Sequence, residues 1–367
     1  MRTLVLALPV AVLLAACSSS ANYSPVTSHH TAEGFRNIYP HPPKPSFWKW
    51  QWERLRYGVP PDPPDGYNFP TVQPDIGFLR ANRTEPTMTW LGHDTFLLQL
   101  GGLNILTDPQ LSERASPLAF AGPKRVVPPP LRFDTLPHID IALISHSHYD
   151  HLDLPTVQGL ARQAGGAPKY LVGLGLKSWF ADNGMTSVQE FDWGESIDID
   201  GLRFYFVPVQ HWSQRTPWDR DRTLWGAWVI EYAGHRIFFG GDFGYSKDLA
   251  DAAERFGGFD LAMVPVGSYE PRWFMKTMHV DPAEAVQAQL DLKARYCVGM
   301  HWGTFRLTDE RLDEPPVKLA QALRAAHVSS ERFFLMKHGE TRKLAPLFAT
   351  RETIEGVEPV PARAAGR

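Results

Sequence analysis

The fold is decided by the stretch Ile139-Asp140-Ile141-Ala142-Leu143-Ile144-Ser145-His146-Ser147-His148-Tyr149-Asp150-His151. Its first half is a short apolar run typical of a buried strand, and its second half holds three histidines and an aspartate within six positions. These residue types are ligands of zinc and similar divalent ions. Because alternate residues of an extended segment point the same way, His146 and His148 can bind one ion, while Asp150 and His151 face a second ion beyond the bend.

Other apolar runs also end in residues that can bind a metal. His211 follows the run 202–209, Asp242 follows the run 236–239, and His301 follows the run 297–300. An isolated histidine is more often an ordinary residue than a ligand, but three such residues, each ending an apolar run beside Gly or Trp, favour a shared site. Gly240 and Gly241 allow the sharp turn that a bridging Asp242 needs.

Apolar runs and helix signals alternate from about Thr87 onward. We predict a hairpin at Gly101-Gly102 between strands over 89–100 and 103–107, and further strands over 139–145, 202–209, 227–232, 236–239, 261–266 and 297–300. Helices are predicted over 154–162 and from the N-cap Asp281 to about Lys293. This pattern predicts a layered α/β domain that ends near Leu347.

The composition is that of an ordinary globular protein. Of the 367 residues, 43% are hydrophobic and 21% are charged, which excludes a wholly disordered, collagen-like or coiled-coil chain. The formal net charge is only −3, so no global basic field attracts nucleic acid. We therefore expect no nucleic-acid partner.

The N-terminal residues are predicted to form a targeting signal. Arg2 precedes the apolar run 4–14, which is too short to span a bilayer, and small residues precede Cys17. The pattern resembles a bacterial lipoprotein signal, in which residues 1–16 are removed and Cys17 carries the lipid. That resemblance, with Ser18 after the anchor, implies a tether on the periplasmic face of the cell envelope, at the outer membrane. The alternative is an uncleaved anchor or a chance cysteine.

The remaining cysteine and the rest of the chain complete the predicted organisation. With Cys17 lipidated, Cys297 has no disulfide partner and is predicted to be a buried core thiol. Residues 17–85 are predicted to be a Pro/Trp-rich extension, residues 86–347 the layered α/β domain and residues 348–367 a flexible tail. Within the extension, Trp48, Trp50 and Trp52 lie among the cations Lys49, Arg54 and Arg56, which suits either a bilayer headgroup region or one flank of the domain.

Further motifs accompany the histidine-rich stretch over roughly residues 87–344. They include Trp90-Leu91-Gly92-His93, Thr107-Asp108-Pro109, Gly267-Ser268-Tyr269-Glu270-Pro271-Arg272-Trp273-Phe274-Met275-Lys276, His301-Trp302-Gly303-Thr304-Phe305 and Lys337-His338-Gly339-Glu340. Together they resemble the metallo-β-lactamase-fold hydrolases, and more narrowly their N-acylphosphatidylethanolamine-hydrolysing phospholipase D branch. The resemblance implies an αββα four-layer sandwich with metals at one edge between its sheets.

The resemblance also implies a ligand set. One zinc ion is bound by His146, His148 and His211, a second by Asp150, His151 and His301, and Asp242 bridges the two. This branch has no cysteine ligand at the second metal, and the residue after Tyr149 is Asp150, so a true β-lactamase is the poorer interpretation.

The implied activity is that of a phospholipase D-type phosphodiesterase, which releases phosphatidic acid and N-acylethanolamine from a phospholipid. A metal pair lowers the pKa of a shared water and neutralises charge on phosphoryl oxygens. Besides Asp150 and Asp242, His279 is a catalytic candidate that could hydrogen-bond a phosphate oxygen or protonate the leaving group. Tyr149 and His279 match substrate-contacting positions; the alternatives are a packing tyrosine and a solvated histidine.

Other histidines and Asp108 have lesser predicted roles. His93 and Asp108 are predicted to orient ligands by hydrogen bonds. Seven histidines are interpreted as ordinary: His29, His30, His41, His138, His235, His327 and His338.

Two other functions remain open from the sequence. A metal-dependent hydrolase of lactones, esters or thioesters could use the same ligands. A non-catalytic envelope lipoprotein predicts missing ligands, and none is missing. Head-group preference, the physiological metal and the oligomeric state, a homodimer included, are left open.

Overall fold

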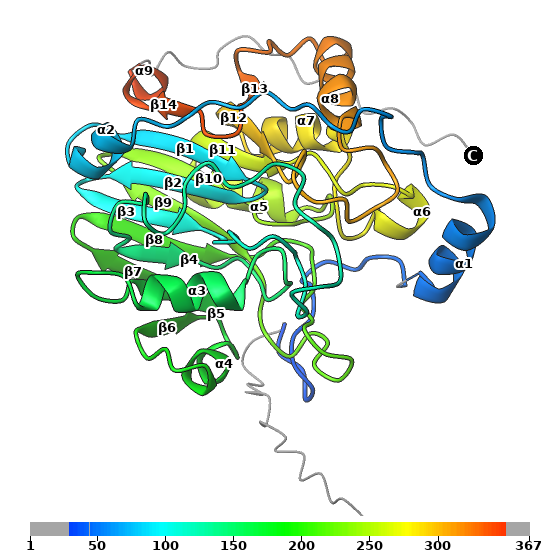
Figure 1. Cartoon of the computed structure of the whole chain (residues 1–367), viewed down its shortest axis with the longest axis horizontal. Helices are drawn as coiled ribbons and strands as arrows, with labels where there is room; N and C mark the ends of the chain where they lie inside the picture. Colours follow the sequence, from blue (N-terminus) through cyan, green and yellow to red (C-terminus); the bar gives the residue numbers. More distant parts are fainter. Residues whose placement is uncertain (1–28, 44, 350–367) are drawn as a thin grey trace, which may run out of the picture.

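Two mixed β-sheets of seven strands each form the centre of the described residues, 29–43 and 45–349, of the computed structural model (Figure 1). The signal segment, the lipidation candidate Cys17 and the tail after Ala349 lie outside the described residues. No helix among the described residues is long and apolar enough to cross a bilayer.

The first sheet has parallel pairing from β3 to β6 and antiparallel pairing elsewhere. In spatial order its strands are β14 (Thr341–Lys343), β1 (Thr87–Gly92), β2 (Thr95–Leu100), β3 (Leu103–Thr107), β4 (Ile141–Leu143), β5 (Lys169–Gly173) and β6 (Val188–Phe191).

The second sheet has parallel pairing from β10 to β13 and antiparallel pairing elsewhere. In spatial order its strands are β13 (Phe333–Leu335), β12 (Ala294–Met300), β11 (Phe259–Pro265), β10 (His235–Phe239), β9 (Ala227–Tyr232), β8 (Leu202–Val207) and β7 (Ser196–Ile199).

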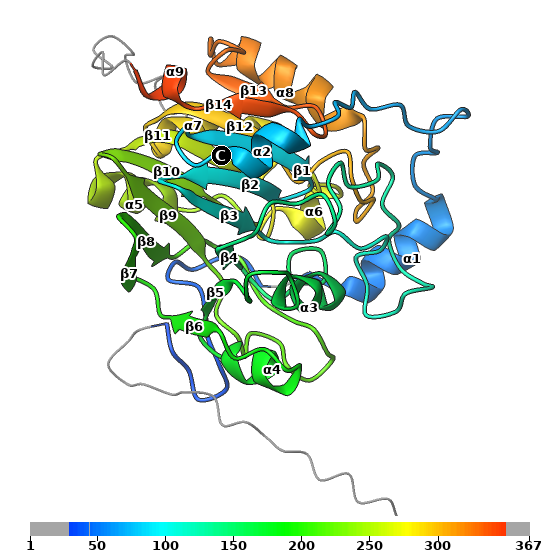
Figure 2. The ribbon, with the colours of Figure 1, turned by 60° about the vertical axis from the view of Figure 1, so that its left-hand side comes forward.

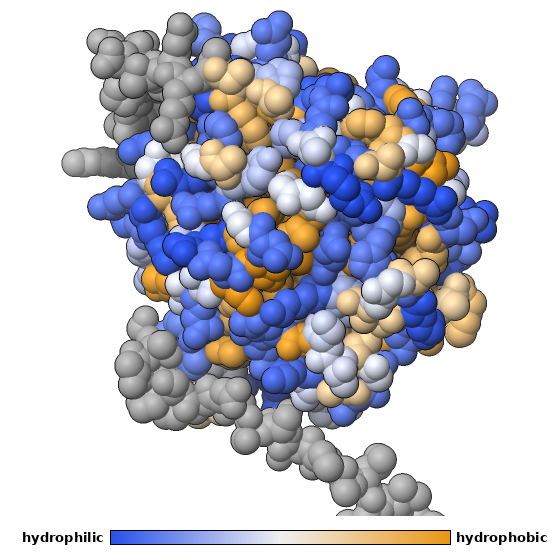
Figure 3. All heavy atoms as spheres, turned by 90° about the vertical axis from the view of Figure 1, so that its left-hand side faces the viewer, coloured by the Kyte–Doolittle hydropathy of each residue, from blue (hydrophilic) through white to orange (hydrophobic). Residues whose placement is uncertain are grey.

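Helices cover the outer faces of both sheets, which gives the predicted αββα sandwich (Figure 2). The helices are α1 (Phe47–Tyr57), α2 (Ile76–Ala81), α3 (Leu154–Ala161), α4 (Lys177–Asp182), α5 (Asp248–Phe256), α6 (Arg272–Met275), α7 (Pro282–Asp291), α8 (Glu314–Ala325) and α9 (Ala345–Phe348). Apolar residues of α2, α3 and α4 pack on the first sheet, whereas α7 contacts β11, β12, α5 and α8. The face shown in Figure 3 is largely hydrophilic, with apolar residues gathered near its middle.

The topology brings the carboxyl ends of six strands to the same end of the sandwich. In the first sheet, β1, β3 and β4 run in one direction, because β2 is antiparallel to both β1 and β3, and β3 is parallel to β4. In the second sheet, β8, β10 and β12 also share a direction, because β9 is antiparallel to both β8 and β10. The segments that leave these strands therefore lie together, as the metal-binding prediction requires.

Most of the predicted elements are confirmed, and one predicted strand is wrong. The hairpin at Gly101-Gly102 joins β2 to β3, and Asp281 caps α7 with Glu284 in a capping box. The predicted strand over 89–100 is in fact two strands, because the chain reverses at His93, whose φ of 53° lies in the left-handed region. The residues Gly92-His93-Asp94 interrupt the apolar run at this turn, and the strand prediction did not take account of that interruption.

The two sheets are joined by packing and by a hydrogen bond. Trp228 on β9 is fully buried, and its Nε1–H donates to the carbonyl oxygen of Ile144, directly after β4, at 3.0 Å. This bond fixes the first sheet two residues before His146.

Cys297 on β12 is buried, as predicted for a core thiol, and its burial raises the pKa of the thiol.

The extension packs on the domain through one face of α1. Trp50 is buried and stacks on Phe274 at 4.7 Å between ring centroids, while its Nε1–H donates to Asp309. Trp48 and Trp52 are 80% and 58% exposed. The packing of Trp50 confirms the flank interpretation for that residue, whereas the headgroup interpretation stays a prediction for the exposed Trp48 and Trp52.

We predict that Trp228→Phe lowers the free energy of unfolding by about 1–3 kcal/mol, because the buried Ile144 carbonyl loses its donor while most of the ring is retained. Urea denaturation measures the change. Trp48→Phe, at an exposed position, serves as the control and should stay within about 0.5 kcal/mol of the parent chain. Equal stabilities for the two variants would contradict an energetic role for this bond.

Candidate metal centre

Four of the predicted ligands form one compact group. Potential ligand atoms of His146, His148, His211 and Asp242 all lie within 4.8 Å of one another. His146 Nε2 is 2.7 Å from His148 Nδ1, and His211 Nε2 is 3.4 Å from the same atom. Asp242 Oδ2 lies 3.9 Å from the Nε2 atoms of both His146 and His211.

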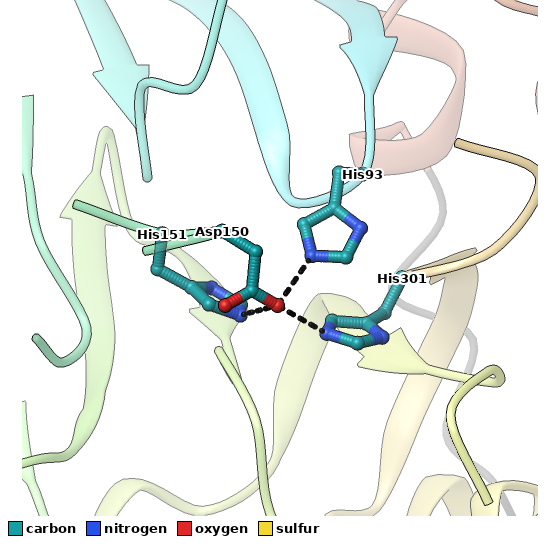
Figure 4. A group of neighbouring side chains, drawn as sticks. All are labelled: His93, Asp150, His151 and His301. Atoms are coloured by element: carbon teal, nitrogen blue, oxygen red, sulfur yellow. Dashed lines mark hydrogen bonds and ion pairs between the residues drawn. The ribbon is translucent and has the colours of Figure 1, made fainter. Parts of the chain in front are cut away.

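The remaining predicted ligands form a second group together with His93 (Figure 4). Asp150 Oδ2 lies 3.3 Å from His151 Nε2, 3.4 Å from His301 Nε2 and 3.1 Å from His93 Nε2. Asp242 reaches this group too, because its two oxygens lie 3.1 Å from His151 Nε2 and His301 Nε2. The structure thus brings all seven predicted ligands together, with Asp242 between the two groups.

Local backbone geometry delivers these side chains to the end of the sandwich. Asp242 follows β10 through Gly241, whose φ of 55° favours glycine and where a Cβ would stand 2.5 Å from Ser145 Cβ. His301 follows β12 with a φ of 62°, and His93 turns the chain between β1 and β2. Strained turns of this kind concentrate where a site requires a particular side-chain direction.

Further hydrogen bonds orient two of the imidazoles. Asp108 Oδ2 lies 2.7 Å from His151 Nδ1, and the Asp108 carboxylate also accepts from the backbone N–H and the hydroxyl of Ser145. His211 Nδ1 lies 2.9 Å from the carbonyl oxygen of Met278 and donates to it. These contacts leave the Nε2 atoms of His151 and His211 to face the centre.

His93 and Asp108 both lie next to candidate ligands, as an orienting role requires. Burial and the neighbouring His301 lower the pKa of His93 to about 3, so its ring is neutral and donates to Asp150 through Nε2. His93 is also close enough to the second group to be a ligand itself. Its orienting role therefore stays a prediction.

The electrostatics of the centre fit divalent cations. Three buried atoms have no hydrogen-bond partner: His151 Nε2, His301 Nε2 and Asp242 Oδ1. Each imidazole nitrogen nevertheless lies 3.1 Å from an oxygen of the Asp242 carboxylate. Burial opposes protonation of His301, but Asp242 and Asp94 outweigh it and raise its pKa to about 10. Burial would also raise the pKa of Asp242, but His301 and His151 hold it well below its usual range. The donor set thus attracts positive charge, and His and Asp side chains are ligands of zinc-type ions.

The two predicted substrate-contacting residues differ in position. His279 borders the centre, with Nδ1 3.9 Å from Asp242 Oδ2 and without a hydrogen-bond partner. Tyr149 lies beside the centre: its hydroxyl donates to the carbonyl oxygen of Arg215 at 2.9 Å, and the Arg215 guanidinium lies 4.1 Å from its ring centroid. The hydroxyl of Tyr149 is therefore engaged by the protein.

One further residue that supports the centre was not predicted from the sequence. Asn37, in the extension, accepts from the backbone N–H of His211 at 3.0 Å and donates to the carbonyl oxygen of the same residue at 2.9 Å. Its side-chain oxygen also accepts from Trp225 Nε1 at 3.2 Å. A single asparagine between Arg36 and Ile38 belongs to no motif, so no local pattern predicts its contact with a residue 174 positions away.

Known proteins resemble this chain in sequence and fold. A family model described as a beta-lactamase superfamily domain matches residues 103–302, more than half of the chain. The N-acyl-phosphatidylethanolamine-hydrolyzing phospholipase D 1 of Caenorhabditis elegans is 40% identical over 248 residues, which cover 65% of this chain and 69% of the nematode protein. The mitochondrial counterpart from Saccharomyces cerevisiae is 38% identical over 238 residues, covering 63% of this chain and 50% of the yeast protein. The solved structure of a possible metal-dependent hydrolase from Veillonella parvula has a TM-score of 0.58 at 17% identity, covering 71% of this chain and 100% of that chain.

The sandwich, its histidine and aspartate groups and these matches define the class: this chain is a metal-dependent hydrolase with the metallo-β-lactamase fold. More narrowly, it belongs to the branch of the beta-lactamase superfamily that includes the nematode phospholipase D. The matched family residues begin at 103, so Asn37 comes from outside them.

We predict that Asn37→Leu makes zinc-loaded protein release its metal about tenfold faster to a chelator, because residues that orient a ligand typically change metal affinity by that order. Asn37→Asp keeps the acceptor for the His211 N–H, so its rate of metal release should lie between the rates of the parent chain and Asn37→Leu. Stopped-flow release into a chromogenic chelator measures the rate. Asn183→Leu, at the end of α4, is the matched control; release as slow in Asn37→Leu as in this control would contradict the prediction.

Proposed function

We propose that this chain is a dinuclear zinc phosphodiesterase of phospholipase D type. Its substrate is N-acylphosphatidylethanolamine or a related phospholipid, and its products are phosphatidic acid and N-acylethanolamine. The observation that carries the proposal is Asp242, whose carboxylate lies within 3.9 Å of imidazole nitrogens in both histidine groups. The printed activity of the two phospholipase D relatives supports the substrate class.

The residues proposed to hold the cations divide between the two groups. His146, His148 and His211 would hold one ion; Asp150, His151 and His301 would hold the other; and Asp242 would contact both. A pair of divalent cations supplies a water of lowered pKa and positive charge against phosphoryl oxygens.

His279 is proposed to orient the phosphodiester by a hydrogen bond. Burial lowers the pKa of His279 to about 4 despite the nearby Asp242, so its imidazole is neutral near pH 7. A neutral imidazole donates one N–H to a non-bridging oxygen but carries no spare proton for a leaving group. Of the two roles predicted for His279, the hydrogen-bond donor is therefore favoured.

Tyr149 is proposed to contact the substrate through its ring. Its hydroxyl is held by the Arg215 carbonyl, and Arg215 is itself fixed by the carbonyl oxygens of Ser147 and Leu152 at 2.7 and 2.8 Å. The half-buried ring next to His148 is thus a rigid apolar surface for a lipid chain or head group.

The extension is proposed to keep the site at a phospholipid surface. Cys17 would carry the lipid tether, on the periplasmic face of the outer membrane. The outward-facing Trp48 and Trp52 lie on α1, which also carries Lys49, Arg54 and Arg56, a combination suited to lipid head groups. On its other face α1 packs against the segment 274–278, which leads directly to His279.

We predict that the parent chain converts N-acylphosphatidylethanolamine to N-acylethanolamine and that Asp242→Asn lowers this rate by about a hundredfold or more, because a metal contact contributes several kcal/mol to the transition state. Mass spectrometry identifies the products from N-acylphosphatidylethanolamine, phosphatidylcholine and a lactone. The matched control is Asp198→Asn, an exposed residue paired with Arg203 on the β7–β8 hairpin. Hydrolysis of the lactone alone would contradict the phosphodiesterase proposal and favour an ester or lactone hydrolase. Hydrolysis of none of the three substrates would favour a non-catalytic lipoprotein.

We predict that replacing both Trp48 and Trp52 by Ala weakens binding of the unlipidated Cys17→Ser chain to phosphatidylethanolamine vesicles by about tenfold, because two indoles lose their interfacial burial. Vesicle sedimentation measures the binding. Hydrolysis of a water-dispersed short-chain substrate should not change. Val317→Ala, on the exposed side of α8, is the control, and equal binding by all three chains would count against a membrane role for α1.

A further inference from the structure

A third group of metal-type ligands lies outside the candidate metal centre, where the extension meets the loop between β6 and β7. His29 Nε2 is 2.6 Å from one carboxylate oxygen of Asp192, and His30 Nε2 is 2.9 Å from the other. The ligand atoms of the three residues lie within 4.8 Å of one another, the same limit that the two groups of the candidate centre meet. All three belong to no predicted site, and the sequence analysis interpreted both histidines as ordinary.

Packing holds the two imidazoles in place. The His29 ring stacks on Trp193 at 4.5 Å between centroids, and the His30 ring meets the edge of Phe35 at 5.0 Å. His29 and His30 are only 7% and 8% exposed. Their own rings stand 4.6 Å apart at an interplanar angle of 77°, which equals the geometry of His146 and His211 in the candidate centre. Such fixed rings need little reorganisation to bind an ion.

Hydrogen bonds also hold the Asp192 carboxylate in a fixed position. The backbone N–H of Trp193 donates to Asp192 Oδ1 at 2.7 Å, and Glu195 accepts from the backbone N–H of Asp192 at 2.8 Å. Burial alone would raise the pKa of Asp192, but the His29 contact outweighs it and the pKa is lowered, so the group is ionised at neutral pH. Two imidazoles and one carboxylate form a donor set typical of zinc-type ions that leaves room for a water.

We propose that His29, His30 and Asp192 bind a third divalent cation of the zinc type, separate from the two ions of the proposed dinuclear centre. The bound ion fastens the extension to the β6–β7 loop across 163 positions of sequence. A cross-link over so long a loop restricts the unfolded chain and stabilises the folded one. From this point the chain runs to Asn37, which contacts His211, so the cation holds the segment that supports a ligand of the main centre.

Metal analysis of the full-length chain tests the proposal. Each protein is equilibrated with buffered zinc, and its zinc content per chain is measured by plasma mass spectrometry. The double variant His29→Gln/His30→Gln and the single variant Asp192→Asn should each contain one ion fewer than the parent chain. His41→Gln, an exposed histidine in the same extension, is the matched control and should lose none. Equal zinc content in all four chains would overturn the proposal and show that His29, His30 and Asp192 form only a hydrogen-bonded contact.

A second measurement on the unaltered ligands covers the case in which these variants fold poorly. In the Asp242→Asn chain, whose main centre is weakened, added Co²⁺ should shift the histidine side-chain NMR signals assigned to His29 and His30, but not those of His41. Unshifted His29 and His30 signals would refute the site. Because neither readout uses hydrolysis, the cation site can fail while the phospholipase activity holds, and the activity can fail while the site holds.

Discussion

The arrangement of this molecule depends on the attraction between one buried carboxylate, Asp242, and the imidazoles that surround it. Burying so many titratable groups is costly unless opposite charges compensate one another. Here Asp242, Asp94 and Asp150 compensate part of the imidazole charge, and together they raise the pKa of His301 to about 10 against the effect of burial. The same negative charge that raises the pKa of His301 also favours divalent cations, and the His and Asp groups at this end of the sandwich could hold them.

Rigid packing keeps these side chains in position. Six strands end at one edge, and the Trp228 bond to Ile144 joins the sheets immediately before the first ligand. Gly241 lets the Asp242 turn approach Ser145, which in turn holds the carboxylate of Asp108 behind His151. The site is thus built on short segments whose ends are fixed by strands, the arrangement that allows precise geometry in a catalytic centre.

The extension is part of the functional unit rather than a simple spacer. It lies before the matched family residues, yet Asn37 holds the backbone of His211 and Trp50 packs on Phe274, close to His279. The same segment presents Trp48 and Trp52 to solvent and the His29–His30 pair to Asp192. If the proposed lipid substrate and the proposed third cation both bind, one stretch of chain would link them to the support of His211.

The sequence by itself determined the candidate ligands: four of them follow the apolar run 139–145, and His211, Asp242 and His301 each follow a run of their own. It also determined the hairpin at Gly101-Gly102 and the capped helix after Asp281. These features were predictable because they depend on local periodicity and on neighbouring residues. The tertiary structure alone decided three other features: the support of His211 by Asn37, the hydrogen bond of the Tyr149 hydroxyl to Arg215, and the approach of His29 and His30 to Asp192. Each depends on a contact between segments far apart in the sequence, and only strand order and packing determine which segments meet.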